Sequence, residues 1–375
     1  MAYMNIAGKP KETLVQVSAT LDLKLGGPTS VVTGLGQSLS DHFELELIVF
    51  GNVEVELPDV LKISTLFGNR YGLFSNYRQR EANAKLAKAD ILLIHGYYLF
   101  STLYALLRAN TNKIFLMPHG SLEPYQDEKS KFAKKIFRVV FMGLASKKEI
   151  VFLVGSSSEK ANIVKKFPSS SVEVVGLGIS KENLESFDRK SKITDPLNLL
   201  CFSRIAEKKR IDLCIRALAN LNQNERNYKL TIAGVGEPKL TKELKDLAIL
   251  LGVENETYFL GFVSDKRKIR ALFLDSDLFL LPSENENFAV AVAESISFGV
   301  PVVVSKFVAM HEFVDTYSTG VTLDQLSTED LSNSIRQATN DLPNLVSNCL
   351  KYRYLLSWSE VSKKWITALS GREHD

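Results

Sequence analysis

The sequence predicts an α/β protein with two doubly wound parallel sheets in tandem. Its 375 residues suffice for two domains of similar size. Short apolar runs alternate with amphipathic helical patterns along most of the chain, which is the order of βαβ units. Several of these runs are apolar on both faces, as in parallel strands that helices cover on each side.

The first domain is predicted over residues 1–185. Its strands are the apolar runs bounded by turn residues, at 13–20, 44–51, 91–96, 113–119, 150–155 and 172–178. Helical periodicity between them predicts helices at 29–39, 77–89, 99–109, 129–146 and 158–167. The segment 180–196 is polar, charged and closed by a proline, so it is the best candidate for a linker.

The second domain is predicted over residues 186–355. Its strands are predicted at 197–203, 229–234, 257–261, 278–281 and 301–305, and its helices at 208–221, 240–251, 266–274 and 288–298. The pattern is helical from residue 327, and Trp358 and Trp365 share one face of the last segment, 356–375. Two tryptophans on one face require an apolar surface, so we expect this helix to cross back and pack toward the first domain.

The composition is that of an ordinary globular protein. Hydrophobic residues make up 45% and charged residues 24%, which excludes a disordered chain, a collagen-like repeat and a small disulfide scaffold. The net charge of +3 is too small to predict nucleic-acid binding, although it leaves a local basic patch open. Cys201, Cys214 and Cys349 have no C-x-x-C spacing, which favours a reducing compartment.

No pattern predicts export or membrane spanning. Residues 1–20 lack the apolar core of a signal peptide. The longest uncharged apolar stretch, 91–107, has 17 residues, is interrupted by His95 and Gly96, and falls just short of a membrane span. We expect it to form a buried strand, a turn and a helix, and we expect the protein to be cytoplasmic.

Ligands of doubly wound sheets bind at the carboxyl ends of the strands, at the switch point, and two such domains in tandem create a cleft. Gly26 and Gly27 directly follow the first predicted strand and precede a helix. Glycines allow a ligand to approach the backbone, and a helix N-terminus attracts an anion. The spacing is neither that of a Walker loop nor G-x-G-x-x-G. A phosphate-facing loop and an ordinary turn therefore both remain open.

A basic segment, 203–210, follows the first strand of the second half and contains Arg204 and Lys209. A guanidinium and an ammonium group at a strand end suit a diphosphate, whose negative charge grows as it leaves. The alternative is a solvated basic helix start, because Lys208 and Arg210 crowd the same turn.

The strongest functional pattern is the segment 281–301, LPSENENFAVAVAESISFGVP. Glu286 lies just ahead of the predicted helix and Glu294 two turns into it, where carboxylates can accept hydrogen bonds from sugar hydroxyls. The backbone N–H groups of the first helical turn suit anionic or hydroxyl oxygens; they belong to Phe288, Ala289 and Val290. The alternative is a Glu that complements the helix dipole and an unrelated surface Glu.

This segment resembles the signature of family 4 of the retaining glycosyltransferases, which have the GT-B fold. The family pattern is P-S-x-x-E-G-F-G-x-x-x-x-E-A-x-A-x-G-x-P-V-x-x-S, and this chain keeps Pro282, Ser283, Glu286, Phe288, Glu294, Gly299, Pro301 and Ser305. It departs at Asn287 and Ala289, where glycines are usual, and at Ser295, where alanine is usual. Further matches are the R-x-x-x-x-K of Arg204 and Lys209, the G-x-G segment at 234–237, the turn at 261–263, and the N-terminal glycine pair.

The resemblance implies a GT-B fold, with two Rossmann-like domains facing a central cleft. It implies transfer of a hexosyl unit, with retention and without a metal or other cofactor, from a UDP- or GDP-sugar to a hydroxyl of a glycan or lipid-linked acceptor. The likeness favours bacterial polysaccharide or lipopolysaccharide assembly. By analogy, Arg204 and Lys209 hold the diphosphate, Glu286 contacts the sugar and Glu294 holds the ribose hydroxyls. Gly234, Asn287 and the Phe288–Val290 turn belong to the donor site, and Phe262 and Val263 belong to the turn that meets the base.

Two histidines end predicted strands of the first half. His119 matches a family histidine that faces the donor sugar, where imidazole or backbone carbonyl can stabilise positive charge at the anomeric carbon. The alternative is a strand-end histidine bonded to nearby backbone. His95 is a weaker candidate for the acceptor site.

The segment 129–148 holds seven basic residues and no acidic one. Phe132, Ile136, Val139, Val140 and Gly143 line one helical face, and the basic residues Lys131, Lys134, Lys135 and Arg138 lie mostly off it. Such a helix can rest on an anionic membrane or meet a lipid diphosphate acceptor. The alternative is a docked amphipathic helix with a solvated basic face.

Asp275 and Asp277 form a D-x-D tripeptide, but they immediately precede a buried strand, and the histidines and cysteines form no metal-ligand pattern. We therefore expect no metal site. Two other functions remain open. One is a nucleotide-sugar epimerase of the same fold, and the other is a nucleotide-sugar-binding protein without turnover.

Overall fold

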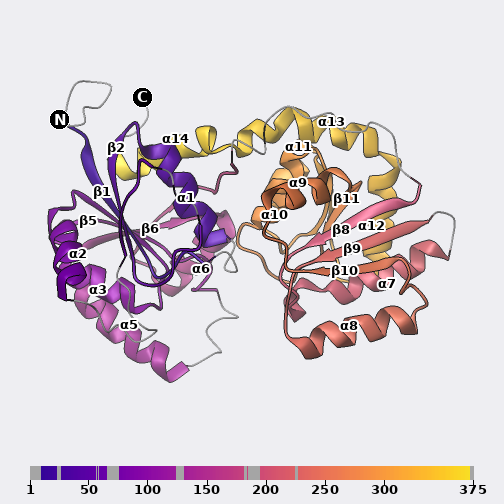
Figure 1. Cartoon of the computed structure of the whole chain (residues 1–375), viewed down its shortest axis with the longest axis horizontal. Helices are drawn as coiled ribbons and strands as arrows, with labels where there is room; N and C mark the ends of the chain where they lie inside the picture. Colours follow the sequence, from indigo (N-terminus) through magenta and orange to yellow (C-terminus); the bar gives the residue numbers. More distant parts are fainter. Residues whose placement is uncertain are drawn as a thin grey trace. The chain divides into compact units, whose positions relative to one another are not determined.

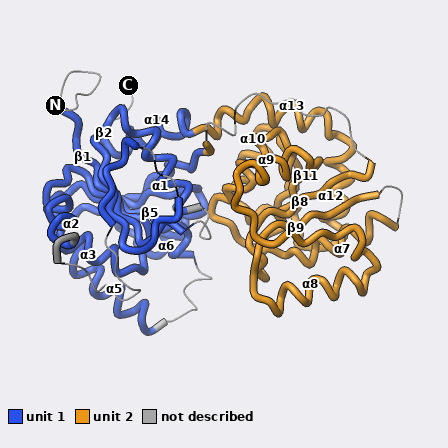
Figure 2. The backbone as a smooth tube through the Cα atoms, viewed as in Figure 1, with its two compact units in different colours: residues 1–178, 358–375 blue, residues 179–357 orange. Residues whose placement is uncertain are grey.

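The computed structural model describes residues 10–22, 27–55, 57, 59–65, 76–123, 131–180, 184, 195–223 and 227–371. The chain forms two compact units. Unit 1 comprises Met1–Gly178 and Trp358–Asp375, and unit 2 comprises Ile179–Ser357 (Figure 2). These boundaries fall a few residues from 185 and 355, where the sequence places the domain ends.

Unit 1 is built on a parallel sheet, in which Figure 1 labels β1, β2, β5 and β6. The sheet has seven strands in the order β3-β2-β1-β4-β5-β6-β7. The strands are β1 Glu12–Ser18, β2 Phe43–Val49, β3 Lys62–Thr65, β4 Ile91–His95, β5 Lys113–Met117, β6 Glu149–Val154 and β7 Ser171–Val174. The order reverses between β1 and β4, so the switch point of this doubly wound sheet lies at their carboxyl ends.

The helices of unit 1 are α1 Gly27–Leu39, α2 Asn76–Lys88, α3 Phe100–Arg108, α5 Lys131–Ala145, α6 Ser157–Lys166 and α14 Trp358–Ser370. Side chains of α2, α3, α5 and α6 share one buried cluster with strand residues such as Val17, Ile94 and Leu116. The α6 helix begins after the N-cap Ser156, whose hydroxyl accepts a hydrogen bond from Glu159 N–H.

Unit 2 is built on a six-stranded parallel sheet of order β10-β9-β8-β11-β12-β13. Its strands are β8 Leu197–Phe202, β9 Tyr228–Ala233, β10 Thr257–Gly261, β11 Leu278–Leu281, β12 Val302–Ser305 and β13 Gly320–Leu323. The switch point lies between β8 and β11, which pair through Leu278 with Leu199 and Phe279 with Leu200.

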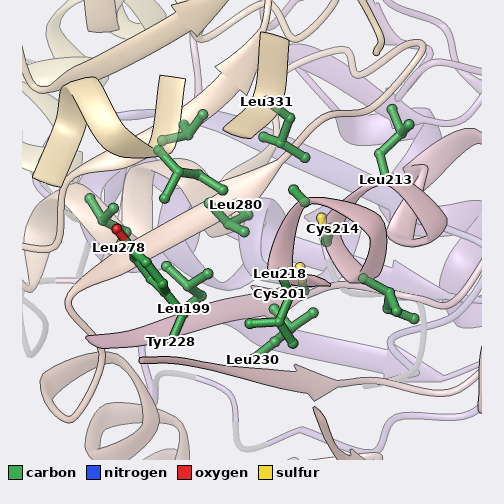
Figure 3. Packing of buried hydrophobic residues seen from close by; sticks show 14 of the residues in the cluster. Leu199, Cys201, Leu213, Cys214, Leu218, Tyr228, Leu230, Leu278, Leu280 and Leu331 are labelled. Atoms are coloured by element: carbon green, nitrogen blue, oxygen red, sulfur yellow. The ribbon is translucent and has the colours of Figure 1, made fainter. Parts of the chain in front are cut away.

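Helices cover both faces of this sheet. They are α7 Ile211–Asn222, α8 Pro238–Leu250, α9 Lys266–Leu274, α10 Val290–Ser297, α11 His311–Tyr317, α12 Thr328–Asn340 and α13 Leu342–Tyr352, with the 3-10 turns η3 Glu207–Lys209 and η4 Arg353–Leu356. Alternate residues of one strand serve opposite faces. Leu280 of β11 packs with Leu218 and Leu331 (Figure 3), whereas Leu281 packs with Val292 of α10. The two-sided burial explains why β11 is apolar throughout.

The predicted strands and helices are present, and the described residues contain three further elements that were not predicted. These are β3, β13 and α11. The two strands are four residues long and lie at the edges of their sheets. They are only partly buried, so their sequences lack a long apolar run.

The terminal helix α14 belongs to unit 1 and packs on α1. Trp358 fills the space beside Gly34, where an added Cβ would lie 2.0 Å from the indole nitrogen. The Trp365 indole N–H donates to the Gly176 carbonyl at 3.2 Å. Both rings are buried, so each tryptophan finds the apolar surface that the sequence requires.

The stretch 91–107 forms β4 and most of α3, as predicted. Within the described residues, no helix is both long and apolar enough to cross a bilayer. Most of the linker candidate at 180–196 lies outside the described residues, as does Gly26, while Gly27 begins α1.

Candidate functional site

The predicted donor-site segments of unit 2 follow two adjacent strands at the switch point. The segment with Arg204 and Lys209 follows β8, and the segment with Glu286 follows β11. Because β8 and β11 are parallel neighbours, their carboxyl ends meet at the same edge of the sheet.

Lys209 and Glu286 form an ion pair at this edge. Lys209 Nζ lies 2.7 Å from Glu286 Oε1, and both side chains are largely buried, with exposed fractions of 11% and 13%. Lys208 Nζ lies 3.4 Å from the same oxygen. Burial lowers the pKa of Lys209, and the Glu286 carboxylate opposes this shift. The carboxylate thus stabilises the charged form of Lys209 although that side chain is largely buried.

Arg204 lies exposed at the end of β8. Its positive charge, together with that of Lys208, also lowers the pKa of Lys209. The structure therefore brings Arg204, Lys209 and Glu286 together, as the sequence predicts, and adds Lys208, which the sequence analysis assigned only to crowding. Two lysines beside one carboxylate, with Arg204 close enough for its charge to act on Lys209, leave a positive charge that attracts a second anion.

Backbone hydrogen bonds connect the two segments. Glu284 N–H donates to the Lys208 carbonyl at 2.8 Å, and Lys208 Nζ donates to the Asn285 carbonyl at 3.2 Å. The loop after β12 also binds the backbone of Glu286. Glu286 N–H donates to Phe307 O, and Ala309 N–H donates to Glu286 O. These bonds fix the backbone of Glu286, from which its carboxylate extends to Lys209.

The helix α10 begins at Val290, two residues later than predicted, because Ala289 has a left-handed conformation with φ 62°. This conformation costs about 1 kcal/mol for an L-residue and almost nothing for glycine. The family pattern has glycine at this position. The turn before Val290 contains Phe288 and Asn287, whose side-chain Nδ2 is buried without a hydrogen-bond partner among the described residues.

Glu294 lies in the second turn of α10 and is half-buried. Desolvation by burial raises its pKa to about 7. Near neutral pH its carboxyl group is therefore shared between the protonated and ionised forms, and it can donate or accept a hydrogen bond.

A hollow of about 570 Å³ lies at the carboxyl ends of β8, β9 and β10. Its lining includes Gly234, Gly236, Lys242, Lys245 and Gly261. An added Cβ on Gly234 or Gly236 would lie within 2.0 Å of a carbonyl oxygen of the 203–205 segment, so this close backbone approach requires glycine. Phe262 and Val263 follow Gly261, and Phe262 is exposed.

The histidines predicted in unit 1 contact each other. His95 Nδ1 and His119 Nε2 lie 3.0 Å apart, and His95 Nε2 lies 3.1 Å from Gln16 Oε1. Burial lowers the pKa of His119 to about 4, and burial together with His119 lowers that of His95 well below its usual value. Both rings are therefore neutral at pH 7, and one N–H is shared between them.

Two residues of this region were missed by the sequence analysis. Gln16 was hidden within an apolar strand. Glu159 holds the loops at the strand ends, since its carboxylate accepts hydrogen bonds from Gly120 N–H at 3.0 Å and Gly155 N–H at 3.1 Å. Its signal was the spacing from Ser156, which is that of a capping box.

The basic residues of α5 lie in two settings. Lys135 is exposed, whereas Lys134 and Arg138 lie over the ring of Tyr98, and Arg138 Nε donates to the Tyr98 hydroxyl at 2.9 Å. The side chain of Lys131 lies outside the described residues. These cations therefore do not form a single solvated face.

The D-x-D tripeptide has a structural role. Asp277 Oδ2 accepts a hydrogen bond from Asn198 N–H, and Asp277 N–H donates to Asn198 O, both at 2.8 Å. These bonds join β8 and β11 at their amino ends, opposite the edge that carries Glu286. No group of metal-binding side chains gathers among the described residues.

Comparisons with known proteins bear on this arrangement. Residues 183–354 match the family model described as "Glycosyl transferases group 1". The crystal structure of WaaG, a glycosyltransferase involved in lipopolysaccharide biosynthesis, superposes with a TM-score of 0.72 at 16% identity over 96% of this chain and 100% of that one. HepE of Anabaena in complex with UDP and glucose gives 0.72 at 18% identity, with the same coverage. The fold is the GT-B fold.

The curated relatives are distant. An uncharacterized glycosyltransferase of Methanocaldococcus jannaschii is 25% identical over 61% of this chain and 58% of its own length. The amylovoran biosynthesis glycosyltransferase AmsK of Erwinia amylovora is 25% identical over 69% of this chain and 65% of its own. The chain thus spans about three fifths of the length of these relatives. In sequence, the chain is thus similar to glycosyltransferases of group 1 over residues 183–354.

Proposed function

We propose that this protein is a retaining glycosyltransferase that moves a hexosyl unit from a UDP- or GDP-sugar to a hydroxyl group of a glycan or lipid-linked acceptor. The observation that carries the proposal is the Lys209–Glu286 pair beside Arg204, just ahead of the N-terminus of α10. Relatives named for lipopolysaccharide and amylovoran biosynthesis favour polysaccharide assembly as the setting.

In this proposal the donor diphosphate binds to the cations of unit 2. Arg204 and Lys209 contact the phosphate oxygens, and the first N–H groups of α10 add donors along the helix dipole. Their charge stabilises the diphosphate as it leaves, so the step requires no metal. Glu286, whose backbone is fixed by hydrogen bonds, accepts hydrogen bonds from hydroxyls of the donor sugar.

The nucleoside is assigned to the neighbouring surface of the same unit. The hollow beside Gly234 and Gly261 admits a flat base close to the backbone, and Phe262 and Val263 directly follow Gly261 in the chain. Glu294 holds the ribose hydroxyls, because a carboxyl group that titrates near pH 7 can both donate and accept hydrogen bonds. The solved structure of HepE, a protein of the same fold, contains UDP and glucose.

His119 stays a proposed residue of the donor-sugar site, and unit 1 is assigned to the acceptor. A neutral imidazole suits that role, because it adds no positive charge where charge develops at the anomeric carbon. No enzyme nucleophile is assigned. The acceptor hydroxyl attacks the face of the anomeric carbon that the diphosphate leaves, which gives retention. We propose that the reaction takes place in the cytoplasm.

The test is a transfer assay with the purified protein, a panel of UDP- and GDP-sugars and a panel of glycan and polyprenyl acceptors. We expect one donor to give a product whose anomeric proton coupling shows retention. A change of the donor sugar without an acceptor would instead indicate an epimerase. Donor binding without any product would indicate a protein without turnover. Inversion at the anomeric carbon would refute the stereochemical part alone.

A further inference from the structure

The helix α5 presents large apolar side chains to solvent. Phe132, Ile136, Val139 and Val140 occupy positions i, i+4, i+7 and i+8, which form one face of an α-helix. Their exposed fractions range from 43% for Val140 to 78% for Phe132. Soluble proteins rarely leave such a stripe uncovered. These four residues are called the apolar stripe below.

The stripe is not the face that docks on unit 1. The docking face carries Phe137, Phe141 and Leu144, which join the buried cluster around Tyr97, and α5 packs against α3 (Figure 1). The helix therefore has two apolar faces, and folding of unit 1 uses only one of them.

Cations border the stripe. Lys135 is exposed one position before Ile136, and Lys134 and Arg138 are held over the Tyr98 ring. Residues 129–148 include no acidic side chain. In a twofold pairing with a second copy, the same basic borders would be brought together and would repel each other. An anionic partner with an apolar interior fits this surface better.

We propose that α5 is an interfacial helix that docks this protein on an anionic lipid membrane. Phe132, Ile136 and Val139 enter the boundary between headgroups and acyl chains, while the exposed Lys135 contacts lipid phosphates. At 15 residues and about 1.5 Å per residue, the helix is too short to span a bilayer and lies in its plane. This proposal is independent of the glycosyl transfer proposed above.

The test is co-sedimentation of the full chain with vesicles, compared between equal parts of phosphatidylglycerol and phosphatidylcholine and phosphatidylcholine alone. We expect binding to the anionic vesicles that weakens as salt rises. Val139→Glu should lower the partition coefficient about tenfold or more, because it puts a charge into the apolar boundary. Leu250→Glu is the matched control, since Leu250 is 81% exposed on α8 of unit 2, and it should bind as wild type does.

Lys135→Glu tests the electrostatic contribution to membrane binding separately from the apolar one. It should weaken binding to anionic vesicles and leave any binding to phosphatidylcholine unchanged. Wild type that stays in the supernatant with both compositions would overturn the proposal, as would Val139→Glu that binds as tightly as wild type. A dimer that Val139→Glu dissociates, without vesicle binding, would also overturn it and would assign the stripe to a second copy. Since the assay contains no donor, its failure leaves the proposed activity untouched.

Discussion

Lys209 Nζ lies 2.7 Å from Glu286 Oε1, and each of the two side chains is little more than one tenth exposed. The two residues come from segments 77 positions apart in the chain, and each segment follows one of the two strands at the switch point of the sheet. This pair joins the cation proposed for the diphosphate to the carboxylate proposed for the sugar.

Glu286→Gln should remove transfer while preserving the fold. The amide keeps the size of the side chain but cannot accept two charge-assisted hydrogen bonds from sugar hydroxyls. We expect the turnover rate to fall at least about a hundredfold, measured with the best donor and acceptor. Glu284→Gln is the control, because Glu284 is half-exposed and pairs only loosely with Arg210, at 3.5 Å. Equal activities of the two variants would remove Glu286 from the site.

Ala289→Gly should stabilise the protein by about 1 kcal/mol, because glycine adopts a φ of 62° without the steric cost that alanine has there. The measurement is urea unfolding at neutral pH. Ala291→Gly, one residue inside α10, should have the opposite sign and lose about 1 kcal/mol. If both substitutions destabilise the protein, the left-handed conformation at Ala289 is not strained.

Glu294 should make stability depend on pH in a predictable direction. Its pKa is raised from 4.5 to about 7, so between these values the folded state binds more protons than the unfolded state. The contribution of this group to stability is complete below about pH 4.5 and is lost as the pH rises to 7. Glu294→Gln should therefore unfold at higher urea concentration than wild type at pH 8, and the difference should shrink by pH 5. A difference that does not change with pH would contradict the burial of an ionisable carboxyl group.

His119 should remain neutral well below its usual pKa of 6.5, because burial lowers its pKa to about 4. Proton NMR of its imidazole between pH 4 and 8 tests this directly. An imidazolium at pH 6 on His119 would mean that its contact with His95 is not the one described.

Much of the fold followed from the sequence, since two-sided apolar strands such as β11 and capped helices such as α6 carry strong local signals. The segment at Glu286 was found because its residues are consecutive. That Glu286 lies beside Lys209 depends on β8 and β11 being neighbours in the sheet. No local sequence pattern encodes which strands are neighbours. The start of α10 was misplaced because a left-handed alanine leaves no signal in the sequence.

The α5 helix shows a different limit. Its sequence contains two apolar faces, one with Phe137 and Phe141 and one with Phe132 and Val139. The hydrophobic pattern cannot say which face docks, because both satisfy the same periodicity. Likewise, Gln16 in β1 reads as an isolated polar residue until the neighbouring strand brings His95 within 3.1 Å of it.

The most direct test of the donor site is calorimetric titration of UDP and of GDP into the wild type and into Lys209→Ala, with Lys239→Ala, an exposed lysine of α8, as the control. We expect wild type and Lys239→Ala to bind one of the two nucleotides equally well, and Lys209→Ala to bind it at least about tenfold more weakly, a loss of about 1.4 kcal/mol. Unchanged affinity in Lys209→Ala, or no binding of either nucleotide to the wild type, would contradict a diphosphate site at the Lys209–Glu286 pair.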